Sequence, residues 1–525
     1  MRLREIGRQP PLVVTALGLI LLQNPLAFAQ SSGFSITPVV KRGDPITDGG
    51  RFFPSEDSEG RVVGLNALNS RGDVAIDADT SGSCSVGRFL ISGGESIRLA
   101  DFCRQTPWGK MGLLGPVNIN NHGQAAYLAG PVNGDRILST LFLYSDGEIS
   151  RIIGEGDATP VGSVFNGCGF SQPSINNSGD VAFSACIQPF GGPIGDGVFV
   201  YSGGVILKVL TDGDPFPTGG ELVVNFIPPV DTFINDRGDM LFFAGLIVSP
   251  AIKERYGLFL STEEGLKTVV LDGDPMPTGG IVMRETLTYG ALNNKRDVAF
   301  LAILQDGPTK SGIFISSNGQ VTKVIAEGDQ TPLGGVFASQ GRRLASLVRP
   351  RFNNNSAVAF YAPITNGAAP WAIFLASPRA MVKVVAIGDH LPTGGKIRDI
   401  NSFALNDLGQ VAFFAAVKNG PQGVFLATPL APEITKVKVK RKGGSLELRV
   451  DGSAMITNDT VIEINGVALT DLKYPSAFQE DGGTITRVIS RDARIEQLVP
   501  LGQTVEVSVF NSLTNLRSAA RSFTR

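Results

Sequence analysis

Short apolar segments alternate with Gly, Asn, Asp and Pro along almost the whole chain. Apolar runs of about four to eight residues bounded by turn-forming residues are typical of β-strands. After the first thirty residues, no segment shows the sustained apolar period that predicts an amphipathic helix. Glycine accounts for 64 of the 525 residues, well above the roughly 7% of average proteins. The pattern predicts an all-β protein.

Two motifs repeat in register with this pattern. The first is an Asn-x-x-Gly turn followed by a Val-Ala-Phe strand, as in residues 176–183. Its Asn recurs at intervals of 51 to 60 residues, at Asn69, Asn120, Asn176, Asn235, Asn293, Asn353 and Asn406. The second motif, Gly-Asp-x-x-Pro-x-Gly-Gly, has variants that begin at Gly43, Gly156, Gly213, Gly273, Gly328 and Gly388. A repeat of this length indicates one supersecondary unit per period.

Each period has room for about four short strands, which is the content of one propeller blade. They are a strand ending at the Asn, the Val-Ala-Phe strand, a Gly-x-Phe strand and a strand entering Gly-Asp. The Asn-x-x-Gly turn fits a type I turn whose last residue has positive φ, which favours Gly. Arg296 and Ser356 replace that Gly in the fifth and sixth repeats. These two turns are expected to be strained or differently built.

The two ends of the repeat region complement each other. The seventh repeat has its Gly-x-Phe strand at residues 423–426 and then reaches Pro429 and Pro432 without a fourth strand. Residues 34–40 form a predicted strand directly before Gly43, where the fourth strand belongs. Such a strand would complete the last blade and remove both open edges, whereas an open solenoid needs distinct capping repeats. We predict a seven-bladed β-propeller closed by its N-terminal strand.

The repeats resemble those of bacterial secreted proteins with tandem Asn-x-x-Gly-x-Val-Ala-Phe repeats. The resemblance covers residues 34–428 and recurs in register seven times. It implies a propeller fold and an extracellular or envelope location, with no established reaction. The chain departs from this pattern in its second repeat, which lacks the Gly-Asp motif, at Arg296 and Ser356, and in having no hydrophobic C-terminal segment.

The N-terminal segment has the pattern of a secretory signal peptide. Arg2, Arg4 and Arg8 precede the apolar residues 12–22, and Ala27 and Ala29 fit a cleavage site. A retained anchor is the alternative. The apolar run is shorter than the roughly 20 residues that span a bilayer, and no later segment reaches that length. We therefore expect a secreted, periplasmic or cell-surface protein without a transmembrane segment in its mature chain.

The pattern changes after a short linker. Alternating strands are predicted at residues 434–440, 446–450, 460–464, 484–489 and 505–510, which suits a small immunoglobulin-like sandwich. The segment 448–466 resembles the IPT/TIG type of that fold. A basic run, 436–442, starts the domain, and charges that guard an edge strand or a surface-anchoring patch would each explain it. The expected divisions are a signal peptide at 1–29, the propeller at 30–428, a linker at 429–432 and the sandwich at 433–525.

Four cysteines in an exported chain predict two disulfides. In an up-and-down blade, Cys84 and Cys186 fall in loops between the second and third strands, and Cys103 and Cys168 fall near Gly-Asp segments. All four are then on one face, which favours the local pairs Cys84–Cys103 and Cys168–Cys186. Zinc is the alternative, but there is no Cys-x-x-Cys pair, and the two histidines, His122 and His390, lie in predicted turns.

No enzymatic motif is present: the chain has no Gly-x-Ser-x-Gly elbow, His-rich metal motif or phosphate-binding Gly-rich loop. We therefore assign no catalytic residue. The Gly-Asp motif does supply recurring carboxylates, which are Asp44, Asp157, Asp214, Asp274, Asp329 and Asp389. Four of these motifs carry a second acidic residue before the Gly, so weak calcium sites are one explanation. Aspartates that accept backbone N–H groups in turns are the favoured explanation, and we expect no metal or cofactor.

The loops between the second and third strands vary most, as at residues 188–196, 248–256 and 363–371. Variable loops on a rigid scaffold usually carry recognition. A net charge of −2 and a pI near 5.9 argue against nucleic acid as a partner. The sequence favours a non-catalytic binding or scaffold protein for an extracellular or envelope protein or polysaccharide. The alternative is an envelope polysaccharide hydrolase or lyase on a propeller scaffold.

Overall fold

The computed structural model describes residues 33–53, 64–81, 84–189, 194–224, 231–248, 254–283, 287, 290–338 and 349–525. The predicted signal peptide lies outside these ranges. Within them the chain forms nine antiparallel sheets, and its helices include the single turns η2 (Ser476–Phe478) and α2 (Ile495–Leu498). The all-β prediction is confirmed. Among the described residues, none of the helices has the length and apolarity to cross a membrane.

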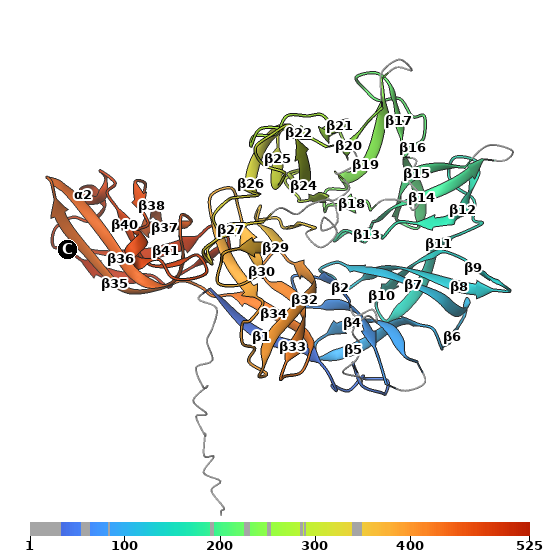
Figure 1. Ribbon diagram of the computed structural model, residues 1–525, viewed down its shortest axis with the longest axis horizontal. Helices are drawn as coiled ribbons and strands as arrows, with labels where there is room; N and C mark the ends of the chain where they lie inside the picture. The colour runs from blue at the N-terminus through green and yellow to red at the C-terminus, as the bar shows by residue number, and fades with distance from the viewer. Residues whose placement is uncertain are drawn as a thin grey trace, which may run out of the picture.

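Seven of the sheets follow one another in chain order around a common centre, from blue to orange in Figure 1. The first contains β2 (Gly64–Leu68), β3 (Val74–Asp79), β4 (Val86–Ser92) and β5 (Glu95–Asp101). The second contains β6 (Gln105–Thr106), β7 (Gly109–Ile119), β8 (Ala125–Asn133), β9 (Arg136–Ile137), β10 (Thr140–Ser145) and β11 (Glu148–Gly154). The third contains β12 (Ser163–Phe170), β13 (Ser174–Ile175), β14 (Val181–Pro189), β15 (Gly195–Ser202) and β16 (Val205–Thr211). The second repeat therefore forms a sheet despite lacking the Gly-Asp motif.

The remaining four sheets of the ring have the same plan. The fourth contains β17 (Glu221–Val223), β18 (Phe233–Ile234), β19 (Met240–Ile247), β20 (Arg255–Thr262) and β21 (Gly265–Leu271). The fifth contains β22 (Ile281–Val282), β23 (Gly290–Leu292), β24 (Val298–Gln305), β25 (Ser311–Ser317) and β26 (Gln320–Ala326). The sixth contains β27 (Val336–Phe337), β28 (Arg351–Phe352), β29 (Val358–Thr365), β30 (Trp371–Ala376) and β31 (Met381–Ala386). The seventh contains β32 (Lys396–Leu405), β33 (Val411–Lys418), β34 (Gly423–Pro429) and β1 (Phe34–Lys41).

Strand β1 comes from the opposite end of the repeat region to its partner. It pairs with β34 along its whole length, from Phe34 opposite Pro429 to Lys41 opposite Gly423. Phe34 and Val40 are buried, at 1% and 4% exposure. The seventh sheet is therefore built from both ends of the repeat region.

The Val-Ala-Phe strand and the strand that follows it pack together through their aromatic rings. The Phe of each Val-Ala-Phe strand stacks on the Phe directly opposite in the Gly-x-Phe strand, with ring centroids 5.8 Å apart for Phe183 and Phe199. The same pair recurs in the fifth, sixth and seventh sheets. The ring of Phe199 also lies over Gly197, where an added Cβ would meet it at 2.7 Å. Glycine leaves room for the opposing ring at Gly197 and at Gly312, while Ala372 occupies the equivalent position in the sixth sheet.

The motif asparagines join the sheets to one another. Each accepts, at its Oδ1, the backbone N–H groups two and four residues ahead, as Asn176 does from Ser178 and Asp180. Each Nδ2 then donates to the next sheet. The acceptor is the main-chain oxygen of the next motif Asn at 2.8 to 3.1 Å for Asn69, Asn120, Asn176, Asn235, Asn353 and Asn406. Asn406 donates to Asn69, which returns the series to the first sheet.

Asn293 is the exception, because its Nδ2 reaches the Ser356 hydroxyl at 3.5 Å. Arg296 and Ser356 adopt φ values of 69° and 61°, close to the 85° of Gly179 in a regular copy. These two turns therefore keep the common shape and carry the strain of a left-handed non-glycine residue. The Arg296 guanidinium contacts Asp239, Glu263 and Glu264, which offsets part of that strain.

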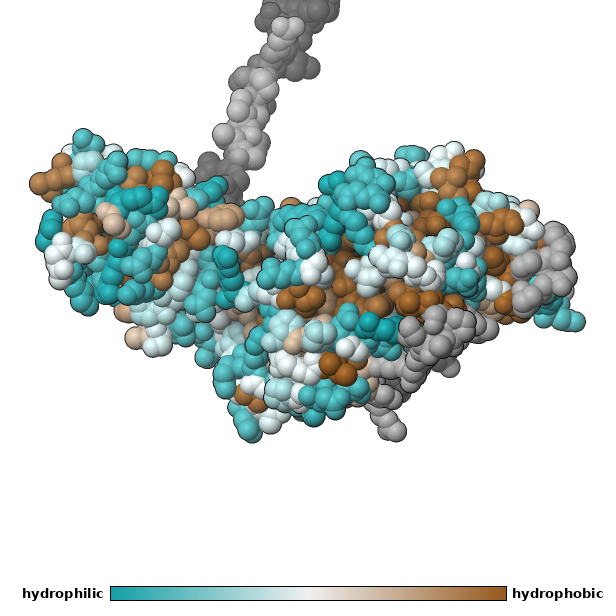
Figure 2. Space-filling model, turned by 90° about the horizontal axis from the view of Figure 1, so that it is seen from above, coloured by the Kyte–Doolittle hydropathy of each residue, from teal (hydrophilic) through white to brown (hydrophobic). Residues whose placement is uncertain are grey.

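The C-terminal segment forms the other two sheets. One has the order β35 (Glu433–Lys442), β36 (Ser445–Ile456), β40 (Thr484–Ser490) and β39 (Leu472–Lys473). The other contains β37 (Thr460–Ile464), β38 (Val467–Ala468), β41 (Thr504–Asn511), β42 (Leu516–Arg517) and β43 (Arg521–Thr524). A separate apolar core lies between them and includes Leu448, Ile464 and Val507. Figure 2 shows this domain beside the ring.

The ring and the C-terminal domain are in apolar contact. Ile456 and Leu513 of the C-terminal domain belong to the same buried cluster as Phe34 and Val384 of the ring. Two backbone hydrogen bonds accompany it, from Lys383 to Gly482 and from Gly482 to Pro332. Strand β1 therefore contacts the C-terminal domain as well as β34.

We expect Asn120→Asp to lower the free energy of unfolding by about 2 to 4 kcal/mol. The carboxylate still accepts the N–H groups of His122 and Gln124, but it cannot donate to Asn176 or to the Gln124 side chain. Urea unfolding measures the change. Asn121→Asp is the control, since the Asn121 Oδ1 only accepts the Ser70 N–H. Equal stability of the two variants would contradict the role assigned to the Nδ2 group.

Stability should also depend on pH through Asp459, which is 8% exposed and accepts the Leu513 N–H at 2.9 Å. Burial raises the pKa of Asp459 from 3.8 to about 6, while the Leu513 and Ser512 N–H groups oppose this. The folded state therefore binds the Asp459 proton more tightly than the unfolded state does. The resulting contribution to stability is fully present below pH 3.8 and is lost as the pH rises through about 6. Between those values unfolding free energy should fall by at most about 3 kcal/mol.

Asp459→Asn keeps an acceptor for Leu513 without titrating, so its decline over the same pH range should be smaller. Urea unfolding of both proteins at several pH values measures this. Parallel pH profiles would show that Asp459 is not responsible.

Candidate functional site

The six aspartates of the Gly-Asp motif occupy six separate turns. Each accepts the backbone N–H three residues earlier at 2.8 to 2.9 Å, in Asp44, Asp157, Asp214, Asp274, Asp329 and Asp389. Each also pairs with a basic side chain from an adjacent strand, namely Lys41, Arg151, Lys208, Arg255, Lys323 and Lys383. These carboxylates stabilise their own turns and do not converge.

The acidic residue before the Gly has a similar role. Asp212 accepts the N–H groups of Asp196 and Val224, and Asp272 accepts that of Tyr256. Their own N–H groups bond to the carbonyls of Asp196 and Tyr256. The six Gly-Asp turns therefore lie beside the start of the third strand in six of the sheets, where the variable loops also emerge. Residues 190–193 and 249–253 of those loops lie outside the described residues.

The cysteines form two neighbouring pairs. Cys168 and Cys186 are joined by a disulfide with a Cα–Cα distance of 5.9 Å. We predicted Cys186 in a loop, but it lies within β14, since that strand extends to Pro189. The Cys84 and Cys103 sulfurs and a carboxylate oxygen of Asp101 all lie within 4.8 Å of one another. Burial, followed by the neighbouring Cys103 and Asp101 side chains, raises the pKa of the Cys84 thiol to about 11.

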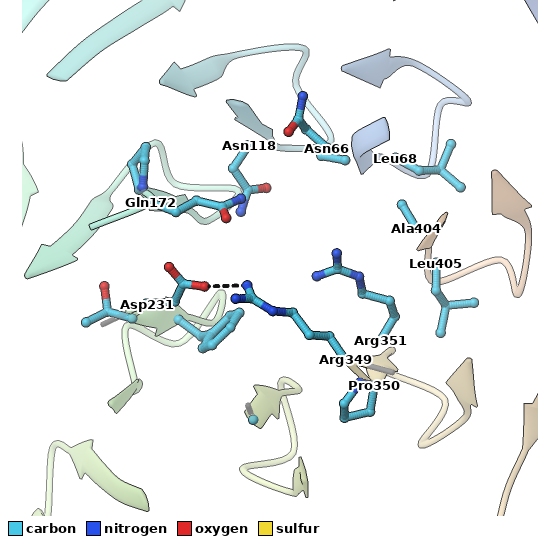
Figure 3. Close-up of a pocket in the computed structure, with 15 residues that line it drawn as sticks. Asn66, Leu68, Asn118, Gln172, Asp231, Arg349, Pro350, Arg351, Ala404 and Leu405 are labelled. Carbon is cyan, nitrogen blue, oxygen red and sulfur yellow. Dashed lines mark hydrogen bonds and ion pairs between the residues drawn. The ribbon is translucent and has the colours of Figure 1, made fainter. Parts of the chain in front are cut away.

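A cavity of about 140 Å³ lies at the centre of the ring (Figure 3). All seven sheets contribute to its wall through their innermost strands or the residues just before them. The lining includes Asn66, Asn118, Gln172, Asp231, Thr232, Gly290, Arg349, Arg351, Ala404 and Leu405. Amide and guanidinium groups dominate the polar part of this wall, so the cavity is rich in hydrogen-bond donors.

The two arginines of this cavity have different partners. Arg349 pairs with Asp231, with an Nη1–Oδ2 distance of 2.8 Å. Arg351 donates from Nε to the Phe403 carbonyl at 3.3 Å, and its guanidinium carbon lies 6.0 Å from the centre of the Phe403 ring. In the described part of the chain, no carboxylate lies within 4.0 Å of Arg351. Arg349, Arg351 and Asp231 together carry two positive charges and one negative charge.

Burial, and then repulsion from Arg349, lower the pKa of Arg351 to about 10, while Asp231 opposes this. The guanidinium stays charged at neutral pH, but its environment supplies less compensation than water would. Thr232 adds a second unsatisfied group. Its side chain is 1% exposed, and its hydroxyl has no hydrogen-bond partner among the described residues.

A second cavity, of about 210 Å³, shares Leu68 and Leu405 with the first and lies on the side of the Asn turns. The residue after each motif Asn lines it, which places Ser70, Asn121, Asn177, Asp236, Asn294, Asn354 and Asp407 around the axis. Six of these seven residues accept, at Oδ1, the N–H of the preceding member at 2.7 to 2.9 Å. Four amides, two carboxylates and the Ser70 side chain therefore form a ring beside the first cavity, which we call the arginine cavity after Arg349 and Arg351.

The sequence prediction missed Arg349, Arg351 and Asp231, although the repeats carry a signal for them. Two residues before the motif Asn, the other repeats have Ala67, Asn118, Ser174, Phe233, Ala291 and Ala404. Arg351 is the one charged residue at this position. The histidines, by contrast, lie where they were predicted, since His122 and His390 are exposed turn residues.

In protein purified from an oxidising compartment, we expect a second disulfide, Cys84–Cys103. Non-reducing peptide mapping should recover this link together with Cys168–Cys186. Replacing Cys84 and Cys103 by Ser should then cost about 3 kcal/mol, as expected for closure of a loop of this size. A Cys84–Cys186 link, or alkylation of both Cys84 and Cys103 in the native protein, would refute the local pairing.

Three solved structures have a backbone similar to part of this chain. The backbone resembles the β-propeller domain of the Trilobed protease from Pyrococcus furiosus, with 8% identity and a TM-score of 0.39 over 70% of this chain and 98% of that one. An uncharacterized protein from Listeria monocytogenes matches with 10% identity and a TM-score of 0.37, over 67% of this chain and 89% of that one. The polysaccharide lyase Uly1 matches with 8% identity and a TM-score of 0.35, over 72% of this chain and 90% of that one.

No curated protein matches the sequence. A family model described as a family of unknown function (DUF7453) matches residues 22–391, which include most of the ring. The chain therefore belongs to the DUF7453 family.

Proposed function

We propose that this protein is an exported, non-catalytic binding protein whose ring centre receives an anionic group of its ligand. In this proposal the seven sheets form a seven-bladed β-propeller closed by β1. The C-terminal sheets form an immunoglobulin-like sandwich, with the domain boundaries predicted from the sequence. The partner is an extracellular or envelope macromolecule.

The observation that carries the proposal is the partly buried guanidinium of Arg351, for which the described residues provide no carboxylate within 4.0 Å. A buried charge is costly unless a counter-charge or several hydrogen bonds satisfy it. Asp231 forms an ion pair with Arg349 in the same cavity. A bound anion would form the corresponding ion pair with Arg351. The Thr232 hydroxyl and the amides of Asn118 and Gln172 line the same space and can donate to that anion.

The chemistry of the wall favours binding over hydrolysis. Glycoside hydrolysis ordinarily uses two carboxyl groups, one of them as the acid. The described lining of the arginine cavity contains one carboxylate, Asp231, and it is held by Arg349. The six motif aspartates are held in separate turns. An arrangement of donors and one excess positive charge suits an anion that is recognised and left unchanged.

The proposal also assigns a role to the loops between the second and third strands. A cavity of about 140 Å³ admits only one group of a macromolecule, so the rest of the ligand must contact the ring surface. The described loop between β29 and β30 places Asn366 at a φ of 60° and buries Ala369, so it is a folded part of that surface. Differences among such loops would give selectivity, and the cavity would give a fixed anchor point.

Sodium acetate should raise the Tm of this protein more than sodium chloride does at equal ionic strength. Arg351→Met should abolish the acetate-specific increase, because it removes the positive charge and keeps an apolar side chain of similar reach. Without acetate, the same variant should be at least as stable as the native protein, since a poorly compensated charge is gone. Differential scanning calorimetry measures both effects.

The exposed Arg521 of the C-terminal domain provides the control, and Arg521→Met should retain the acetate effect. An equal acetate effect in Arg351→Met and native protein would sink the proposal, as would the absence of any acetate-specific effect.

A further inference from the structure

One face of the C-terminal sheet β35-β36-β40-β39 is strongly basic. Residues directly opposite each other in an antiparallel sheet point to the same side. Lys438 lies opposite Arg449, Arg449 opposite Ile489, and Ile489 opposite Lys473, so this row crosses all four strands. A second row has Lys436, Asp451 and Arg487, and Lys440 lies opposite Glu447.

This basic face is the outer side of the sheet. The alternate residues Leu448, Val450 and Val488 point the other way into the apolar core. The rows named above, the Lys440–Glu447 pair and Arg491 carry seven basic side chains, Lys436, Lys438, Lys440, Arg449, Lys473, Arg487 and Arg491, and two acidic ones, Glu447 and Asp451. At the two ends of β35 the register adds Lys442 and Glu433, whose charges cancel. The net charge of the basic face is therefore +5 on a chain whose total is −2. The remainder of the chain has a net charge of −7, so the basic face is a local concentration of charge.

The two carboxylates are already engaged by arginines. Glu447 is 2.5 Å from Arg449 and 2.8 Å from Arg491. Asp451 accepts two hydrogen bonds from Arg487, at 2.5 and 2.9 Å. By contrast, no carboxylate within the described chain lies within 4.0 Å of the lysine ammonium groups of the basic face. These lysines are Lys436, Lys438, Lys440 and Lys473.

The lysines repel one another. The ammonium group of Lys436, and to a lesser extent that of Lys440, lowers the pKa of Lys438. All three are exposed along β35 and alternate in sequence, so they stand about 7 Å apart in a line. Without a counter-ion, this line of like charges opposes folding of the strand.

Protection of an edge strand explains only part of this arrangement. Lysines on an exposed edge such as β35 discourage pairing with another chain. That role does not require Arg449 and Arg487 on the two central strands, or Lys473 on the opposite edge. The basic side chains extend across the sheet, as expected for a surface that meets an extended polyanion.

The side chains of the basic face argue against a membrane or a nucleic acid as its partner. Ile489 is its one apolar residue in the paired rows and is only half-buried, whereas a membrane-binding surface inserts several large apolar side chains. The aromatic ring of Phe478 beside the face is covered by the Arg487 guanidinium at 4.0 Å, so it offers no platform for a nucleic-acid base. The available groups are lysine ammonium ions, which act as hydrated point charges.

We propose that the basic face of the C-terminal domain binds an acidic polysaccharide, with Lys436, Lys438, Lys440 and Lys473 meeting successive carboxylates of the polymer. The attachment is electrostatic and is displaced by salt. It is separate from the arginine cavity of the ring, so either interaction can exist without the other.

Binding of the full-length mature protein to immobilised sodium alginate, with neutral dextran as the reference, tests this. We expect binding to alginate at low salt and release as sodium chloride is raised. Replacing Lys436, Lys438 and Lys440 together by Gln should weaken binding at least tenfold. The Tm should be unchanged or higher, because mutual repulsion is removed.

A matched variant controls for net charge. Lys110, Lys396 and Lys418 are exposed lysines of the ring, and replacing them by Gln removes the same three charges elsewhere. This variant should bind alginate as the native protein does. The proposal is overturned if both triple variants lose affinity equally, if neither does, or if the protein binds vesicles of phosphatidylcholine and phosphatidylglycerol or duplex DNA but not alginate.

Discussion

The side-chain amide of the motif asparagine is the group on which the rest of the ring depends. It accepts two N–H groups within its own turn and donates to the main chain of the next sheet. Asparagine combines an acceptor and a donor on a side chain short enough to do both at a tight turn. Aspartate lacks the donor. One residue type therefore fixes the local turn and also the position of the neighbouring sheet.

The same constraint places the cavity at the ring centre. Since every innermost strand ends at such an asparagine, the residues two to four positions earlier face one another across the axis. Buried Phe pairs hold the third, fifth, sixth and seventh sheets behind their inner strands. A site built this way needs few residues of its own, because the scaffold supplies the geometry. Arg349, Arg351 and Asp231 then give one region of a repetitive wall a distinct charge.

The features that recur in every repeat could be predicted from the sequence. Much of what is specific to one repeat could not. The motif spacing, the strand next to each motif and the turn role of the aspartates all follow from local chemistry. Asp231 and Arg349, however, are 118 residues apart and meet only because two sheets face the same axis. The basic face of the C-terminal domain likewise depends on contacts between residues that are distant in the sequence. Alternation places Lys436, Lys438 and Lys440 on one side, but only the strand register adds Arg487 and Lys473.

If the asparagine amides couple the sheets, the ring should unfold as one unit. Native-state hydrogen exchange in increasing concentrations of urea, followed by mass spectrometry, resolves the opening of each sheet. The slowest amides of the innermost strands should share one opening free energy and one dependence on urea in all seven sheets. Sheets that open one after another, each with its own free energy, would show instead that the units are joined only by nearest-neighbour contacts, as in an open solenoid.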